Sequence, residues 1–271
     1  MPSTLGHALR ALEDLAPLRL AAQWDNVGLL VEPPAAAGRA GHRRPLTGVL
    51  LAIDATDNVI VEAVRRRCQL VVAYHPPIFS GLKALRASAP RTRGLLRAVQ
   101  NDIAIYSPHT ALDAAAGGLN DWLAAPFGRV GAEPLEPIPG EPPGVGQGRL
   151  LTLPKAKTLA AIVTLLKQHL GVARLRVARS LLEPGAKVRT VALAAGAGGA
   201  LLRDADLFFT GEMRHHDVLA AIEAGRHVVL AEHSLTERGY LPILARQLRR
   251  ALGAGVRIHV SRADREPIQA G

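Results

Sequence analysis

A histidine and a glutamate stand four residues apart in the segment Val228 to Gly239, where an apolar run ends and a helical pattern begins. Side chains at this spacing lie on one face of a helix, so His233 and Glu237 can both reach one cation. A structural interpretation competes with this one. Ser234 followed three residues later by Glu237 is also the pattern of a capping box, which satisfies amides of the first helical turn. The stretch alone leaves both interpretations open.

Three other apolar runs also end at imidazole or carboxylate side chains. These are His75 after the run 70–74, His109 and Asp113 after the run 103–106, and Glu212, His215 and His216 after the run 206–210. Ligands bind just beyond the carboxyl ends of parallel strands, so we expect all these side chains to gather at one edge. For His215 and His216, a helix-start pair bonded to the backbone is the alternative.

Imidazole and carboxylate ligands together are typical of Zn, Fe, Mn, Ni or Co, and a glutamate that can bridge two cations indicates a pair. We therefore predict divalent metal ions as cofactors, one or two per chain. If two are bound, they share a water and lower its pKa towards neutrality, which predicts hydrolysis at carbon or phosphorus. His109, Glu212 and His215 are the candidate catalytic residues for moving protons.

The elements around these residues predict an α/β fold. A strand at 49–53, a helix at 58–67 and a strand at 70–74 form a βαβ unit, and a helix at 91–100 and a strand at 103–106 repeat the pattern. The strands are almost wholly apolar, which favours a mostly parallel sheet covered on both faces. An N-terminal helix at 3–15 should pack on this sheet, and Trp24 should lie in the core because large aromatic side chains are mostly buried.

The segment 126–148 is rich in Pro and Gly and lacks periodicity, which predicts a boundary between two lobes. We expect an N-terminal α/β lobe at 1–125, a linker at 126–148 and a C-terminal α/β lobe at 149–271. A chain of 271 residues is long enough for two such domains. The second lobe should include a helix at 158–170, a long helix at 236–252 and a closing strand at 256–260.

The run from Ala194 to Ala200 contains Gly196, Gly198 and Gly199, and it partly matches a dinucleotide-binding fingerprint. The third glycine of that fingerprint falls on Leu201, and no acidic residue closes a following strand at the usual distance. We interpret the run as a tight turn that lets a helix dock on the sheet, with phosphate binding at the helix start as the alternative.

The net charge of +10 comes almost entirely from scattered arginines, and aromatic residues make up 3% of the chain. Neither feature favours direct nucleic-acid binding, which needs a basic stripe and interleaved aromatics. Cys68 is the single cysteine, so no disulfide can form within the chain, which favours a reducing compartment. We see no secretory leader and no apolar run of about 18 residues, so we expect a cytoplasmic protein without a membrane span.

Five segments in order carry a family resemblance. They are Trp24–Leu29, Tyr74–Phe79 with Lys83, Ser107–Asp113, Gly211–Met213 with His215 and His216, and Glu232–Gly239. Together they resemble the NIF-three-like proteins, which are also catalogued as GTP cyclohydrolase type-2 homologues. The chain is most similar to the shorter, eukaryotic-type branch, which lacks the extra domain that some bacterial members insert between the lobes.

The resemblance implies two similar α/β lobes, a dinuclear metal centre between them and a ring-shaped homohexamer. Carried over by motif, His75 and Asp113 hold one metal, His233 holds the other, and Glu237 bridges them. Many bacterial members have two histidines where this chain has Tyr74 and His75, so either Tyr74 or another group substitutes, or the second site is weaker.

The family name suggests a metal-dependent hydrolase that acts on a nucleotide or phosphoester-like substrate. The sequence itself shows no pocket for guanine. The alternative is a non-enzymatic, metal-stabilised hexameric scaffold or an adaptor for other proteins, including transcriptional ones.

Overall fold

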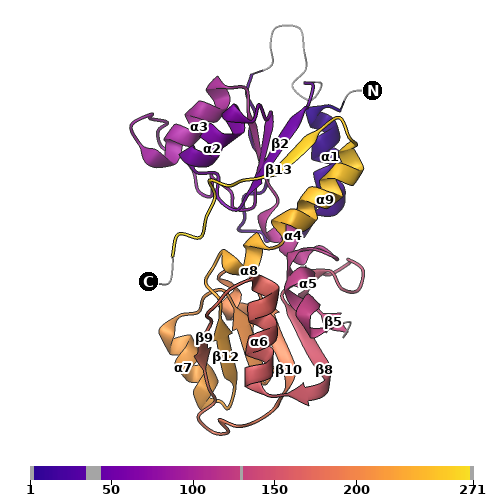
Figure 1. The fold of residues 1–271 in the computed structure, drawn as a ribbon, viewed down its shortest axis with the longest axis vertical. Helices are drawn as coiled ribbons and strands as arrows, with labels where there is room; N and C mark the ends of the chain where they lie inside the picture. Colours follow the sequence, from indigo (N-terminus) through magenta and orange to yellow (C-terminus); the bar gives the residue numbers. More distant parts are fainter. Residues whose placement is uncertain (1–2, 35–43, 129–130, 269–271) are drawn as a thin grey trace. The chain divides into compact units, whose positions relative to one another are not determined.

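The computed structural model describes residues 3–34, 44–128 and 131–268. The chain folds into two compact units, which we describe separately. Unit 1 takes its residues from 3–112 and 240–268, and unit 2 consists of residues 113–239. In Figure 1, unit 1 carries both the indigo start and the yellow end of the chain, whereas unit 2 runs from magenta to orange.

Unit 1 is built on a five-stranded sheet. In spatial order its strands are β1 (Gly28–Val31), β4 (Ala104–Ser107), β3 (Leu70–Ala73), β2 (Gly48–Ala52) and β13 (Arg257–Val260). The last four run parallel, and β1 pairs with β4 in the antiparallel direction. The carboxyl ends of β2, β3 and β4 therefore lie at the same edge of the sheet.

Helices cover both faces of this sheet, as its fully buried central strands require (Figure 1). They are α1 (Leu5–Leu15) and α9 (Leu241–Leu252) on one face, and α2 (Asp57–Arg65) and α3 (Pro90–Gln100) on the other. The hydroxyls of Thr4 and Thr56 accept hydrogen bonds from amides in the first turns of α1 and α2, which fixes where these helices begin.

The last helix and strand belong to unit 1, which corrects the expected C-terminal lobe of 149–271. β13 pairs with β2, from Arg257 opposite Gly48 to Val260 opposite Leu51, and α9 packs against α1. β2 is wholly apolar, and without β13 it would form an unprotected edge. The expected helix at 236–252 is also divided into α8 (Leu235–Arg238) and α9. Gly239 lies between them, and any side chain at this position would collide with the ring of Trp122.

Unit 2 contains a six-stranded mixed sheet. Its strands in spatial order are β5 (Ala132–Glu133), β8 (Arg149–Lys157), β10 (Val188–Ala194), β11 (Leu207–Thr210), β12 (His227–Leu230) and β9 (Arg176–Ala178). The three strands β10, β11 and β12 are parallel, and β8 and β9 flank them in the antiparallel direction. Parallel strands thus form the centre of both sheets, and the expected α/β class is confirmed.

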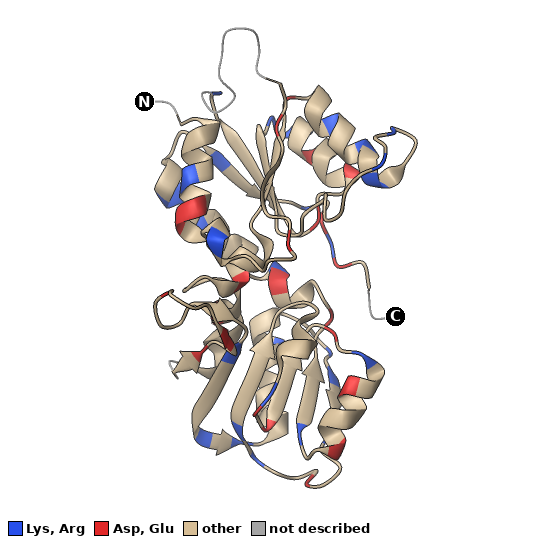
Figure 2. Cartoon of the chain, turned by 180° about the vertical axis from the view of Figure 1, so that it is seen from behind, with Lys and Arg blue, Asp and Glu red and all other residues tan. Residues whose placement is uncertain are grey.

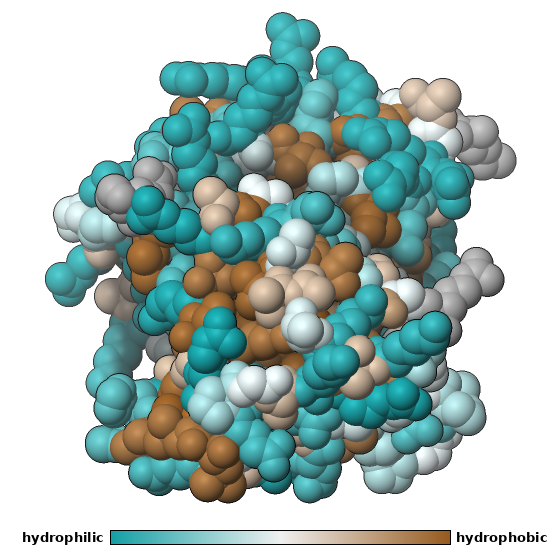
Figure 3. All heavy atoms as spheres, turned by 60° about the horizontal axis from the view of Figure 1, so that its bottom comes forward, coloured by the Kyte–Doolittle hydropathy of each residue, from teal (hydrophilic) through white to brown (hydrophobic). Residues whose placement is uncertain are grey.

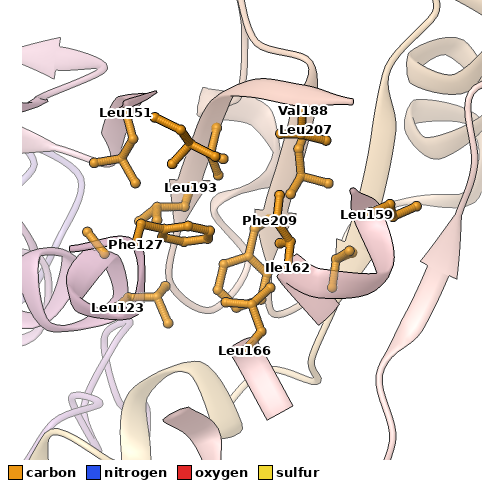
Figure 4. Packing of buried hydrophobic residues seen from close by; sticks show 14 of the residues in the cluster. Leu123, Phe127, Leu151, Leu159, Ile162, Leu166, Val188, Leu193, Leu207 and Phe209 are labelled. Atoms are coloured by element: carbon orange, nitrogen blue, oxygen red, sulfur yellow. The ribbon is translucent and has the colours of Figure 1, made fainter. Parts of the chain in front are cut away.

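Alternation along the strands gives this sheet two apolar faces. Val191 and Leu193 of β10 join the cluster that includes α5 (Leu119–Ala124) and α6 (Leu159–Leu170), whereas Ala192 and Ala194 join the cluster that includes α7 (His215–Glu223). Figure 4 shows the first cluster, in which the side chain of Phe209 lies among those of the helix α6. Burial on both faces explains why these strands are almost continuously apolar.

The Pro- and Gly-rich segment 126–148 is part of unit 2, which corrects the expected linker. It supplies β5, which pairs with β8, and the two short strands β6 (Glu136–Pro137) and β7 (Gly146–Gln147), which pair with each other. Residues 129–130 of this segment, and 35–43 of the Pro- and Gly-rich loop at 33–45, lie outside the described residues.

The boundary of unit 2 lies before Asp113, so residues 113–125 also leave the expected N-terminal lobe. Arg149, which is 0% exposed, gives the physical reason. Its guanidinium binds the carboxylate of Asp121 at 2.5 Å and donates to the carbonyl oxygens of Gly146 and Gly148 at 2.7 Å. A buried charge needs such partners, and they fasten the segment around Asp121 to the sheet of unit 2.

Basic and acidic residues are interspersed over both units in Figure 2, in agreement with the scattered charge of the sequence. Figure 3 shows apolar residues in patches among hydrophilic ones on one face, and the exposed apolar side chains of unit 2 include Leu181 and Leu182. None of the helices in the described part of the chain has the length and apolar character that a membrane span requires.

Candidate functional site

Two histidines follow the neighbouring strands β3 and β4 of unit 1. The amide of His75 donates to the carbonyl of Ile53 at 2.9 Å, which continues the pairing of β3 with β2. The Nδ1 atom of His75 lies 3.0 Å from Oδ1 of Asp54, the residue that follows Ile53. The rings of His75 and His109 are 5.5 Å apart between centroids. The structure thus brings these two of the strand-end histidines close together.

His109 is held by Asp25, which the sequence analysis did not assign to the site. Gly28 of β1 lies opposite Ser107 of β4, so the turn before β1 lies beside the end of β4. The Asp25 carboxylate lies 2.8 Å from Nδ1 of His109 and accepts hydrogen bonds from the amide and hydroxyl of Thr110 at 3.2 and 2.5 Å. Its side chain is 0% exposed.

Burial by itself would raise the pKa of Asp25, but the hydrogen bonds from His109 and Thr110 outweigh it, and the pKa is lowered. Asp25 is therefore an ionised group that fixes the ring of His109. His109 also has a φ of +30°, an unusual backbone angle for a residue with a side chain. Such strain at the start of α4 (His109–Ala114) is held by the surrounding contacts.

Strands β11 and β12 of unit 2 deliver a second group of donors. The Nδ1 atom of His233 lies 2.9 Å from Oε1 of Glu212, and its Nε2 atom lies 3.3 Å from Oε1 of Glu237. The Glu237 side chain is 2% exposed. The structure thus brings together three of the residues predicted at strand ends.

The capping-box alternative at Ser234 and Glu237 is wrong. The Ser234 hydroxyl makes no capping hydrogen bond to α8 and instead accepts one from Nη2 of Arg238 at 2.9 Å. The neighbouring Thr236 hydroxyl donates to the carbonyl of His233 at 2.7 Å and accepts from the amide of Gly196 at 2.8 Å. These bonds fix the segment so that Glu237 faces His233.

Gly196 leaves the space that these donors occupy. It follows β10 with a φ of +57°, and a Cβ atom at this position would lie 2.5 Å from Oε1 of Glu237 and 2.9 Å from Nε2 of His233. The glycine run is a turn, as predicted, but it leads only into the short 3-10 helix η4 (Gly198–Leu201). Its first glycine is needed for the close approach to the donor atoms.

Each of the three histidines places Nδ1 against a carboxylate: His75 against Asp54, His109 against Asp25 and His233 against Glu212. When Nδ1 donates its proton to a carboxylate, the lone pair is on Nε2, which is the arrangement found in histidines that bind metals. The donor types and the cradle at Gly196 therefore fit a divalent metal. The signal for Asp54 was in the sequence, because it directly follows the strand 49–53.

The remaining predicted residues have different surroundings. Asp113 is partly buried near the end of α4. The Asn120 side chain donates to the backbone carbonyl of Asp113 at 3.2 Å and accepts a hydrogen bond from the amide of Ala195 at 3.1 Å. His215 is exposed at the start of α7, with its ring 5.3 Å from that of His216, and in the described part of the chain no hydrogen bond joins it to His233.

Tyr74 is 3% exposed, and its ring lies 5.0 Å from the ring of His75 and 5.4 Å from the ring of His109. A buried aromatic ring therefore packs against both histidines of unit 1.

The fold and the two donor groups define an α/β protein of two units in which strand-end histidines are paired with carboxylates. The chain belongs to the Duf34/NIF3 (NGG1p interacting factor 3) family, whose model matches residues 3–267. It is 38% identical over 272 residues to the protein NIF3 homolog of Schizosaccharomyces pombe, covering 96% of this chain and 95% of that protein. It is 37% identical over 267 residues to NIF3-like protein 1 of Drosophila melanogaster, covering 97% and 88%.

Solved structures share the fold. A Bacillus cereus protein related to NIF3 superimposes with a TM-score of 0.85 at 22% identity, with both chains covered completely. Reduced HcgD from Methanocaldococcus jannaschii gives a TM-score of 0.80 at 24% identity, covering 96% of this chain and 98% of that one. The family model and the curated relatives confirm the family expected from the five motifs, and these structures confirm the fold.

Proposed function

We propose that this protein binds one or two divalent metal ions and hydrolyses a nucleotide or phosphoester-like substrate. Within unit 2, Nε2 of His233 and Oε1 of Glu237 lie 3.3 Å apart, and both atom types bind divalent metals. We assign His75 and Asp113 to one metal, His233 to the other and Glu237 to both. The observation that carries the proposal is the cradle at Gly196, where a missing side chain leaves room for Nε2 of His233 and Oε1 of Glu237.

A bound divalent ion would supply Lewis-acid polarisation and a more acidic water. The chain's own residues would orient the ligands and move protons. Glu212 and Asp54 hold the Nδ1 atoms of His233 and His75, which fixes the direction of each ring. His109, oriented by Asp25, would exchange a proton with the substrate through Nε2. His215 remains a second candidate for proton transfer.

A metal-stabilised scaffold or adaptor is the second candidate function. A relative from Saccharomyces cerevisiae that is 37% identical over 259 residues carries the name NGG1-interacting factor 3, which describes a protein interaction. In this alternative the metal would hold a homohexamer together in the cytoplasm without turnover. Both candidates predict metal binding, so catalysis distinguishes them.

The test is elemental analysis of purified protein combined with turnover of a panel of nucleotides and phosphoesters. We expect one to two metal ions per chain in the wild type, and loss of most of them in the double variant His75→Ala, Asp113→Ala. Glu237→Ala should abolish turnover, whereas the exposed control Glu223→Ala should change neither property. Full metal content in the double variant would overturn the ligand assignment. Metal binding with no turnover would favour the scaffold.

A further inference from the structure

Two aromatic side chains of unit 1 are exposed to solvent, and both adjoin His109. Trp24 was expected in the core, but it is 65% exposed, and Phe79 is 48% exposed. All three tyrosines of this chain and its other three phenylalanines are buried. Exposure of an indole forgoes the burial that normally stabilises it. Two exposed aromatic rings beside a candidate catalytic histidine are what a binding surface for a ligand would present.

The two rings surround His109 closely. The centroids of Trp24 and Phe79 are 6.0 Å apart, with an angle of 58° between the rings. The Trp24 centroid lies 6.2 Å from that of His109, and the Phe79 centroid lies 6.4 Å from it, both with edge-to-face geometry. A planar ring that stacks on either aromatic would therefore meet the other at its edge, and both arrangements are favourable.

The backbone segments that carry the two rings are joined to each other without a ligand. The Asn26 side chain donates to the carbonyl of Ile78 at 2.5 Å, which joins the turn that carries Trp24 to the loop that carries Phe79. Pro76 and Pro77 restrict the backbone of that loop. Asp25, next to Trp24, binds His109 directly. The aromatic pair and the proton-transfer candidate thus share one framework within unit 1.

We propose that Trp24 and Phe79 form a binding surface for a planar heteroaromatic ring, such as a nucleobase, which places the attached phosphoester near His109. The position of the phosphoester for hydrolysis rests on the proposed function, whereas binding of the ring to Trp24 and Phe79 does not. Stacking of a base on an aromatic side chain contributes about 1–3 kcal/mol by alanine substitution, which corresponds to roughly a 5- to 150-fold change in affinity.

The test is isothermal titration of the metal-loaded full chain with AMP, with GMP and with ribose 5-phosphate, which lacks the base. We expect both nucleotides to bind at least about fivefold more tightly than ribose 5-phosphate. Trp24→Ala and Phe79→Ala should remove most of that difference, and Trp24→Phe should restore part of it. The control Leu85→Ala removes another exposed apolar side chain, 56% exposed, and should have no effect.

A location readout comes from the variant Trp122→Phe, in which Trp24 is the sole tryptophan. Its fluorescence should change on addition of AMP and saturate with the affinity measured by titration. Equal affinities for AMP and ribose 5-phosphate, or an unchanged AMP affinity in Trp24→Ala, would overturn the inference. So would a change of sedimentation coefficient in Trp24→Ala without loss of AMP binding, because the rings would then be a subunit contact.

The two proposals fail separately. Turnover that depends on Glu237 but binding that is indifferent to Trp24 would leave the hydrolase and remove the aromatic surface. Nucleotide binding that depends on Trp24, without turnover of any substrate in the panel, would leave the surface and remove the hydrolase.

Discussion

Replacement of Gly196 by alanine tests whether the donors of unit 2 need the space beside this residue. The new Cβ would lie 2.5 Å from Oε1 of Glu237 and 2.9 Å from Nε2 of His233, so the donor atoms must move. The Glu237 side chain is 2% exposed and has little freedom to move without disturbing the core. We expect metal affinity to fall by at least the 10- to 100-fold that is typical when the support of a metal ligand is removed, about 1.4–2.7 kcal/mol.

The backbone contributes a separate cost. Gly196 has a φ of +57°, and a non-glycine residue in the left-handed region loses roughly 1–2 kcal/mol of folding free energy. Gly171, which ends α6 with a φ of +68°, has the same backbone cost, but a Cβ atom added there would have no neighbouring atom within 4 Å. Gly171→Ala is therefore the matched control, because it adds the strain without displacing a donor.

The assay pairs urea unfolding of the metal-free protein with zinc titration of the folded protein. Gly171→Ala should be destabilised by about 1–2 kcal/mol and bind zinc like the wild type. Gly196→Ala should be destabilised at least as much and bind zinc more weakly. If Gly196→Ala binds zinc with wild-type affinity, the glycine is needed only for the backbone conformation of the turn, and the donors do not need the space beside it.

Three further perturbations act on named contacts. Asp25→Asn should lower turnover while the metal content of the protein stays at the wild-type level, as measured by elemental analysis; loss of metal would contradict a role confined to His109. Asp54→Asn should weaken zinc binding about 10- to 100-fold, since Asp54 supports His75, and an unchanged titration would exclude that support. Glu62 has a pKa lowered to about 2 because hydrogen bonds from Ser261 and the following loop outweigh its burial. Its stabilisation, at most about 3 kcal/mol, should be complete above the unfolded value of 4.5 and disappear as the pH falls towards 2. Acid unfolding of Glu62→Gln with the wild-type pH slope would contradict this.

The positions of the residues at the strand ends were predictable because parallel strands all end at the same edge of their sheet. Apolar runs that stop at a polar residue place that residue at the carboxyl edge, whatever the loop length. This reasoning brought His75 close to His109, and Glu212 close to His233. It did not find Asp25, because Asp25 precedes β1, which is antiparallel to β4. Its position beside His109, 84 residues away, depends on the register that sets Gly28 opposite Ser107.

The unit boundaries were hidden for a related reason. The many Pro and Gly residues in 126–148 show only that the backbone lacks long regular elements. A linker and a series of short strands have this composition in common, so the sequence did not distinguish them. The evidence that assigns this segment to unit 2 is the burial of Arg149 and its bonds to Asp121 and Gly146, and a charged residue at a strand start is normally exposed. Likewise the strand 256–260 has an apolar pattern that fits either sheet, and only its pairing with β2 selects unit 1.

The division into two units also determines which side chains orient the histidines of the candidate site. Every histidine–carboxylate pair described here forms within one unit: His75 with Asp54 and His109 with Asp25 in unit 1, and His233 with Glu212 in unit 2. Each ring is therefore oriented by a carboxylate of its own unit. A metal that binds such preset ligands does not have to supply the free energy of ordering them. The carboxylates next to the ligands, rather than the ligands alone, should thus determine how tightly the protein holds its metal.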